Sequence, residues 1–104
     1  MRPIDLTGKA AFVTGSSQGI GESIARALHA AGSKVAINYF EDEEGINRRK
    51  AEAVCASLGS GAIPVAGDVR SLSQMESAVS QSVSQFGGLD ILVNNAGILR
   101  DRTL

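Results

Sequence analysis

Apolar and polar residues alternate along the chain in blocks that predict four strands and three helices. Short apolar-rich runs, typical of buried parallel strands, cover residues 9–14, 34–39, 62–66 and 89–93. Between them, apolar residues recur every three or four positions, as on one face of a helix, in residues 19–31, 51–58 and 75–86. A glycine follows each of these three segments and marks the end of each helix.

Polar residues refine where the second and third helices begin. Acidic residues 41–44 precede Arg48, an order that complements a helix dipole, and Glu44 and Arg48 have the spacing of a helical ion pair. This pattern places the acidic run in the first turn of the second helix. Ser73 with Glu76 three residues later is a capping-box signature, which indicates that the third helix begins at Ser73.

Alternating strands and helices with short connections predict an α/β fold, a Rossmann-like doubly wound parallel sheet with its four strands in the order 3-2-1-4 and three helices. Pro64 has no amide hydrogen for a ladder, so the third strand should lie at an edge. No fifth strand remains to pair with residues 89–93, which would therefore present an apolar edge. We expect an incomplete fold, in which residues 1–104 form the N-terminal part of a single domain.

Composition and charge exclude several classes of function. The chain has 104 residues, 43% hydrophobic and 20% charged, and a net charge of −1, so neither a nucleic-acid-binding face nor a polybasic membrane anchor is expected. The first residues lack an apolar signal core and no segment is long enough to span a membrane, which predicts a cytoplasmic protein. Cys55 is the only cysteine, so no internal disulfide and no metal cluster is expected.

Residues 14–21, with the sequence TGSSQGIG, join the first strand to the first helix and are typical of a phosphate cradle. Gly15 allows a sharp exit from the strand, Gly19 lets a pyrophosphate approach the backbone, and Gly21 lets the helix pack tightly on the sheet. The first helical amides are orphan donors that a diphosphate satisfies, and Ser16 and Ser17 add hydroxyl donors. Because the spacing differs from the common GxGxxG, a glycine-rich turn without a ligand is the alternative.

Two further segments converge on the same edge of the predicted sheet. Residues 94–97, with the sequence NNAG, follow the fourth strand beside the first strand and so face the crevice of the glycine turn. Asp68 follows the third strand, where it is placed to accept a hydrogen bond from the exocyclic amine of adenine. Either segment is also an ordinary turn, but together with residues 14–21 they favour a nucleotide site.

These three motifs resemble the N-terminal part of a classical short-chain dehydrogenase/reductase. The matches are TGxxxGIG at residues 14–21, DV at 68–69 and NNAG at 94–97, and the resemblance covers essentially the whole chain. Residues 97–101 further resemble the branch of 3-oxoacyl-[acyl-carrier-protein] and acetoacetyl-CoA reductases. The resemblance implies an oxidoreductase that uses NAD or NADP to transfer hydride between nicotinamide and a carbonyl or alcohol.

The resemblance also implies a set of cofactor-binding residues. Residues of the glycine turn would line the pyrophosphate and ribose, those after the third strand would flank adenine, and those after the fourth would support the ribose nearer the nicotinamide. Asn94 would in addition tie the fourth strand to its neighbours, and residues near the end of the second strand would set the choice of cofactor. The implied residues are Gly15, Ser16, Ser17, Gln18, Gly19, Ile20, Gly21, Asn38, Tyr39, Asp68, Val69, Asn94, Ala96 and Gly97.

The choice between NAD and NADP depends on charge near the end of the second strand. Residues 38–41 offer no cation, and Gln18 in the glycine turn offers none. A 2′-phosphate would meet Glu41 and Asp42 unfavourably. The sequence therefore favours NAD slightly, although the resembled branch usually uses NADP.

The resemblance stops short of the catalytic residues. The family uses a Ser, a Tyr and a Lys four residues after that Tyr, whereas the only tyrosine here is Tyr39 and Glu43 follows it by four. No catalytic residue can be named, and we expect the chain alone to be inactive, as a truncated member of the family. The alternative is a non-enzymatic nucleotide-binding or interaction module, and the apolar fourth strand predicts self-association or pairing with full-length subunits. Another Rossmann-like class, such as a methyltransferase, is disfavoured by residues 94–97.

Overall fold

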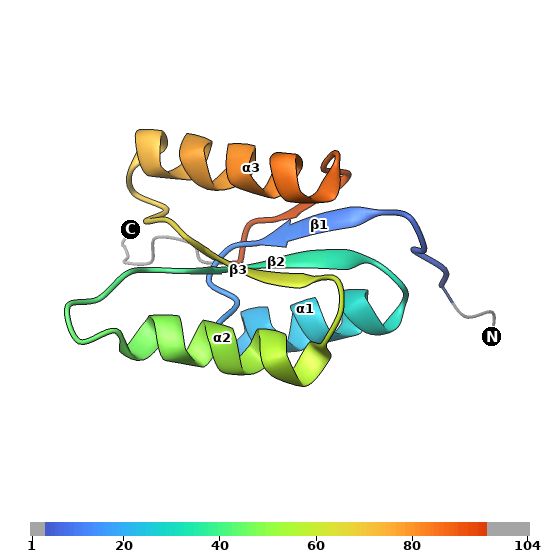
Figure 1. Cartoon of the computed structure of the whole chain (residues 1–104), viewed down its shortest axis with the longest axis horizontal. Coiled ribbons are helices and arrows are strands. Elements are labelled where there is room, and N and C mark those ends of the chain that lie inside the picture. Colours follow the sequence, from blue (N-terminus) through green and yellow to red (C-terminus); the bar gives the residue numbers. More distant parts are fainter. Residues whose placement is uncertain (1–3, 96–104) are drawn as a thin grey trace, which may run out of the picture.

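The computed structural model describes residues 4–95 as a parallel four-stranded sheet with helices on both faces (Figure 1). The strand order is β3-β2-β1-β4, and each neighbouring pair is parallel. This confirms the predicted Rossmann-like sheet in the order 3-2-1-4 with three helices. In chain order the elements are β1 (Ala10–Val13), α1 (Gly19–Ala30), β2 (Lys34–Tyr39), α2 (Ile46–Leu58), β3 (Ala62–Ala66), α3 (Leu72–Phe86) and β4 (Ile91–Val93).

Strand β1 is apolar throughout and β2 carries only two polar residues, Lys34 and Asn38, as expected where helices cover both faces of the sheet. Helices α1 and α2 lie on one face and α3 on the other (Figure 1). Successive side chains of a strand point to opposite faces, so Val13 and Ile37 pack against α1 and α2, whereas Phe12 and Ala36 pack on the side of α3. All four are 0% exposed. The continuous apolar runs of the sequence thus correspond to strands buried on both sides.

Pro64 lies in β3, at one edge of the sheet, as predicted. Its partner in the register is Ile37 of β2, and β3 pairs with no second strand among residues 4–95. An edge strand can carry a proline because one row of its amides makes no ladder hydrogen bond.

Helix α2 begins later than the charge pattern predicted, because a residue that precedes the helix, Asp42, accepts hydrogen bonds from its first amides. Its first two amides donate to the Asp42 carboxylate at 3.0 and 2.8 Å, which keeps the pKa of that carboxyl below its usual value. The acidic run therefore precedes the helix instead of forming its first turn. Arg48 pairs with Glu41, at 2.6 Å, so the predicted pair with Glu44 is wrong.

The N-cap of helix α3 lies two residues before the predicted cap, Ser73. Ser71 is the last extended residue, with φ −112° and ψ 110°, and its hydroxyl accepts a hydrogen bond from the Gln74 amide at 3.3 Å. Ser73 is already inside the helix. The serine that caps was therefore assigned wrongly. Ser71 forms a serine N-cap without the reciprocal bond of a capping box, because the Gln74 side-chain oxygen accepts from the Asp68 amide at 3.0 Å.

The first isoleucine of α1, Ile20, does not lie on the buried face of the helix. Gly21 and Ala25, four residues apart, are buried, and Ile24 and Leu28 pack at the margin of the core. The apolar spacing within residues 19–31 places Ile20 on the same face as Ile24 and Leu28, but Ile20 is 74% exposed, so this part of the prediction is wrong. An exposed isoleucine thus stands in the first turn of α1, at the carboxyl edge of the sheet.

Cys55 lies on the buried face of α2, where burial, with a smaller contribution from Glu52, raises the pKa of its thiol to about 11. A thiol with so high a pKa is protonated at neutral pH and is a poor nucleophile.

In the part of the chain that the structure describes, no helix is both long and apolar enough to cross a membrane.

Candidate functional site

The predicted site residues that the structure describes lie at or near the carboxyl ends of the strands, around the turn that joins β1 to α1. Strand β1 lies between β2 and β4, so the chain leaves β1 toward one side of the sheet and later returns on the other side. In open parallel sheets, ligands bind at such a switch point, outside the carboxyl ends of the strands.

Three glycines allow α1 to start directly against the end of β1. A Cβ on Gly21 would lie 2.3 Å from the carbonyl oxygen of Gly15 and 2.7 Å from the Asn95 side-chain nitrogen, closer than atoms can approach. Gly15 and Gly19 adopt φ of +59° and +64°, a left-handed conformation that glycine adopts without strain. A Cβ on Gly19 would meet nothing within 4 Å, so its backbone faces open space.

The N-terminus of α1 differs from the other two helix starts in having no side-chain cap. Its N-cap residue, Gln18, is extended and makes no capping hydrogen bond, whereas Asp42 holds the first amides of α2 and Ser71 caps α3. Within residues 4–95, no side chain caps the positive end of this 12-residue helix. Orphan amides at the positive end of a helix dipole suit an anion.

Ser16 supports the shape of the turn. It is 0% exposed, and its hydroxyl donates to the Val13 carbonyl oxygen at 2.7 Å and accepts from the Asn38 amide at 3.0 Å. Its own amide donates to the Asn38 carbonyl at 2.9 Å. The sequence predicted a hydroxyl donor to a ligand at Ser16, but the structure uses that hydroxyl proton within the protein.

Asn38 fastens the glycine turn to β2 and β3. Its side-chain oxygen accepts from the Gly15 amide at 3.1 Å, and its side-chain nitrogen donates to the carbonyl oxygens of Val65 and Gly67 at 3.2 and 3.1 Å. The residue is 1% exposed. The sequence placed Asn38 among the residues that contact cofactor and missed this role, although a lone amide inside an apolar strand was a signal that it would be buried and bonded.

Tyr39 also points into the protein, not toward the edge of the sheet. It is 6% exposed and belongs to the core cluster on the α1 and α2 side. Burial, with the nearby charge of Glu41, raises the pKa of its phenol. Neither side chain predicted at the end of β2 is therefore presented at the surface of the site.

Asn95 joins the end of β4 to the glycine turn. Its side-chain nitrogen lies 3.3 and 3.4 Å from the carbonyl oxygens of Thr14 and Gly15. The sequence assigned this tie to Asn94, which is exposed, so the assignment was wrong by one residue. The other two predicted residues of this motif, Ala96 and Gly97, lie outside the described residues.

Beside β3, Asp68 is already bonded to its neighbour. Its carboxylate accepts from the backbone amide of Arg70 and from two guanidinium nitrogens at 2.9 to 3.0 Å, and these bonds lower its pKa. The Arg70 guanidinium lies 5.8 Å from the centre of the Phe40 ring, which is 48% exposed. Val69, between them in sequence, is half-buried. The sequence predicted Asp68 and Val69 here but missed the cation and the aromatic ring.

A cation also reaches the glycine turn from α2. Lys50 donates to the side-chain oxygen of Gln18 at 2.5 Å, across 32 residues of sequence. Both line a groove of about 370 Å³ between α1 and α2, together with Ser17, Glu22 and Arg26. The prediction from the sequence considered only residues 38–41 and Gln18 as the source of a cation, and so it missed Lys50.

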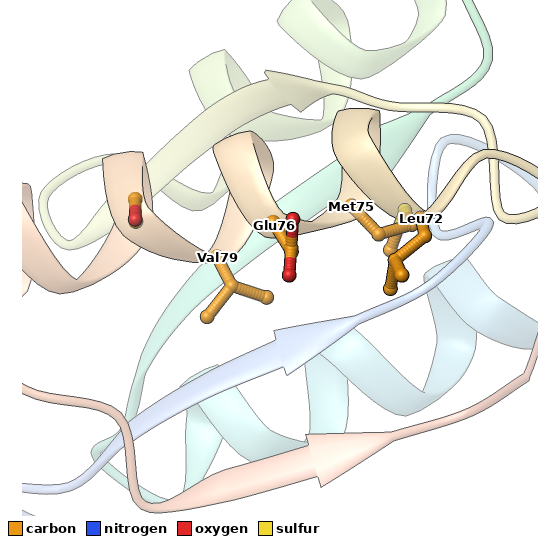
Figure 2. A pocket seen from close by; sticks show the side chains of 5 residues that line it. Leu72, Met75, Glu76 and Val79 are labelled. Atoms are coloured by element: carbon orange, nitrogen blue, oxygen red, sulfur yellow. The ribbon is translucent and has the colours of Figure 1, made fainter.

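A second hollow, of about 520 Å³, lies along α3 and away from the glycine turn (Figure 2). The side chains of Leu72, Met75 and Val79 point from α3 toward the sheet, on the side of β4. Leu72 is 76% exposed, and Leu92 of β4 is 63% exposed. This face carries apolar surface and no cluster of ionisable groups.

A family model described as short chain dehydrogenase matches residues 9–104. The 3-oxoacyl-[acyl-carrier-protein] reductase FabG of Staphylococcus aureus is 43% identical over 99 residues, which cover 92% of this chain and 38% of that protein. A blue fluorescent protein from a metagenomic library, solved in complex with NADPH, has a TM-score of 0.84 and 39% identity over 92% of this chain and 39% of its own. The 3-ketoacyl-(acyl-carrier-protein) reductase of Brucella melitensis, complexed with NADH, has a TM-score of 0.79 and 39% identity over 90% and 36%. The chain thus spans well under half the length of these proteins.

Proposed function

The chain belongs to the short-chain dehydrogenase family, and from this premise we propose that it binds a nicotinamide dinucleotide at the carboxyl edge of its sheet. The observation that carries the proposal is the uncapped start of α1 behind a glycine turn that leaves no room for a Cβ at Gly21. Two similar solved structures hold NADPH and NADH. Such a dinucleotide, when bound, supplies or accepts the hydride that converts a carbonyl to an alcohol or the reverse.

In this proposal the residues of the site divide into those that contact the dinucleotide and those that position the contacts. The turn amides and the first turn of α1 hold the diphosphate, and the Phe40 and Arg70 side chains lie beside the adenine position at Asp68 and Val69. Ser16, Asn38 and Asn95 hold the turn in place through their hydrogen bonds. The proposed contact residues are Gly15, Ser17, Gln18, Gly19, Ile20, Gly21, Asp68, Val69, Asn94, Ala96 and Gly97.

We propose further that residues 1–104 bind the dinucleotide without reducing a carbonyl themselves, as the N-terminal part of a single Rossmann domain. The only tyrosine, Tyr39, is buried in the core, and Glu43 stands four residues after it, so no Tyr and Lys pair is present to move a proton. The parent reaction is hydride transfer between nicotinamide and a carbonyl or alcohol, with 3-oxoacyl thioesters as the substrate class that the relatives suggest. A cytoplasmic location stays a prediction from the sequence.

The test uses the exposed side chain at the start of α1. We expect Ile20→Glu to weaken binding of NADH and NADPH by about tenfold, because a carboxylate next to the helical amides repels the diphosphate. Folding should be unchanged or slightly improved, because an acidic residue in the first turn complements the helix dipole. Calorimetric titration of both dinucleotides measures the affinities, and thermal unfolding monitors the fold.

Ile20→Gln is the matched control, since it has nearly the same size and polarity as the glutamate variant without its charge. It should bind much more tightly than Ile20→Glu. Equal affinities of the two variants, or no binding by the unchanged chain, would contradict the proposed site. The proposal that residues 1–104 do not reduce a carbonyl themselves is tested by an assay of the unchanged chain with NADPH and acetoacetyl-CoA. Turnover above background would contradict that proposal.

We also propose that the outer edge of β4 is covered by another polypeptide, either a second copy of this chain or a full-length family member. Among residues 4–95, β4 pairs only with β1, and Leu92 is 63% exposed. An open apolar edge strand is prone to pair with another strand.

We expect light scattering to show a molar mass that rises with protein concentration, and a smaller rise for Leu92→Lys. Ile46→Lys, on α2 away from β4, should behave as the unchanged chain, and a mass independent of concentration would contradict self-association.

A further inference from the structure

The face of the sheet on which α3 packs is bare over β4. Leu92 of β4 is the register partner of Phe12, which packs on the side of α3, so Leu92 points to that side as well. Helix α3 contacts β1, β2 and β3, and Leu92 is 63% exposed. Ile91 and Val93 point to the opposite face, where they pack against the core cluster under α1 and α2. Within residues 4–95, nothing therefore covers the α3 side of β4.

The exposed side of α3 forms a wall beside this bare strand (Figure 2). The hollow of about 520 Å³ lies along it, and the lining residues, at i, i+3, i+4, i+7 and i+8, share one side of the helix. They are Leu72, Met75, Glu76, Val79 and Ser80. Leu72, in the first turn of α3, is 76% exposed. Contiguous exposed apolar surface is typical of a site that binds another apolar segment.

One acidic residue gives the hollow its charge. Glu76 is the only ionisable residue of the lining, and it forms no ion pair with any other residue from 4 to 95. A segment that is complementary to this surface therefore carries apolar side chains together with a cation.

The chain leaves β4 at the end of α3 that carries Leu72. Helix α3 follows β3 and precedes β4, and the two strands run in the same direction, so α3 runs opposite to them and starts where β4 ends. Figure 2 shows the strand arrows below α3 pointing toward the end with Leu72. Residues 96–104 can span up to about 30 Å when extended, whereas the 15 residues of α3 measure about 22 Å. The segment is therefore long enough to reach along the hollow.

The composition of this segment is complementary to the hollow. Residues 98–104 have the sequence ILRDRTL, with three apolar side chains, two arginines and one aspartate, so the segment has a net charge of +1. The apolar residues suit the apolar wall of α3, and the arginines suit the unpaired acid. They are Ile98, Leu99 and Leu104, and Arg100 and Arg102.

We propose that residues 98–104 dock in the hollow of α3 and cover the α3 side of β4. Their apolar side chains pack against Leu72, Val79 and Leu92, and an arginine pairs with Glu76. This contact leaves the backbone groups of the outer edge of β4 open, so it is distinct from the self-association proposed above. It involves no dinucleotide and does not depend on the proposed dinucleotide site.

The first test places a fluorescent reporter in the segment. The chain has no tryptophan, so Leu99→Trp supplies a single one. We expect its emission to be blue-shifted, and its quenching by acrylamide to be weaker, than for the same variant unfolded in urea. Adding Leu72→Gln should shift the docking equilibrium about tenfold toward the free segment, because the burial of one leucine is lost. Ile46→Gln, at a residue of α2 that is 41% exposed, is the matched control and should change neither signal.

The second test reverses the charge in the hollow. In the Leu99→Trp background, Glu76→Arg should increase quenching, because it repels the two arginines of the segment. Combining Glu76→Arg with Arg100→Glu and Arg102→Glu should restore the weaker quenching. Glu43→Arg, at an exposed acid that precedes α2, is the control and should have no effect. Thermal unfolding confirms that each variant folds.

Three results would overturn the proposal. Quenching of Leu99→Trp as strong in the folded chain as in urea would show that the segment is free. Quenching that changes with neither Leu72→Gln nor Glu76→Arg would show that the segment packs elsewhere. Quenching that weakens as protein concentration rises would place the segment on a second copy of the chain. Because no dinucleotide is added, each of these results leaves the proposed dinucleotide site to its own test.

Discussion

Gly21→Ala is expected to lower the free energy of unfolding by about 2 kcal/mol and to abolish measurable dinucleotide binding. The added Cβ would meet the carbonyl oxygen and carbon of Gly15 at 2.3 and 2.9 Å. These are backbone atoms, so α1 and the turn must move apart, and overpacking of this kind costs about 1–3 kcal/mol or more. The higher helix propensity of alanine offsets up to about 1 kcal/mol. Displacing α1 also moves its orphan amides away from the turn, which is why binding should fail as well.

Gly88→Ala is the matched control for this change. A Cβ there would meet nothing within 4 Å, and its backbone is outside the left-handed region. We expect its stability to stay within about 0.5 kcal/mol of the unchanged chain. Urea unfolding followed by circular dichroism measures both variants, and equal midpoints for Gly21→Ala and Gly88→Ala would contradict the close approach of α1 to the turn.

Asn38→Ala is expected to destabilise the chain by about 3 kcal/mol, because it leaves three backbone groups without their side-chain partner and each buried unpaired group costs about 1–3 kcal/mol. These are the amide of Gly15 and the carbonyls of Val65 and Gly67. Dinucleotide affinity should fall too, since the turn loses its link to β2 and β3. Asn47→Ala is the control, because its side chain makes one exposed hydrogen bond, to Phe40, and should cost about 1 kcal/mol or less.

Asn38→Asp separates the hydrogen-bonding role from simple loss of volume. The carboxylate can still accept from the Gly15 amide, but its other oxygen faces two carbonyl oxygens in place of donating to them. Burial and this repulsion raise the pKa of the new carboxyl in the folded state. Its protonated form is therefore favoured on folding, and the stability of the variant relative to the unchanged chain should fall as pH rises through that pKa. A pH-independent difference would contradict the buried contact with the two carbonyls.

Local signals in the sequence were sufficient for the elements and for their order in the sheet. The apolar runs of β1 and β2 indicated burial on both faces, and Pro64 indicated an edge strand; both are confirmed. The wrong predictions selected a residue one or two positions away from the one that the structure uses. Ser71, not Ser73, caps α3, and Asn95, not Asn94, joins the end of β4 to the glycine turn. In each of these pairs the two residues have the same chemistry, and only the backbone conformation decides which one is used.

The sequence by itself determined the alternation of strands and helices, the glycine turn and the family, because periodicity and backbone preference are properties of short segments. Only the tertiary structure decided what the polar side chains of the site do. Asn38 binds Gly15 across 23 residues, and Lys50 reaches Gln18 across 32, so neither contact leaves a pattern in the sequence. Such contacts depend on which face each helix turns to its neighbour, as with α1, where Gly21 packs inward and Ile20 faces solvent. The charge of the groove between α1 and α2 also depends on tertiary contacts. Arg26 pairs with Glu22 there, whereas Lys50 contacts the neutral side chain of Gln18.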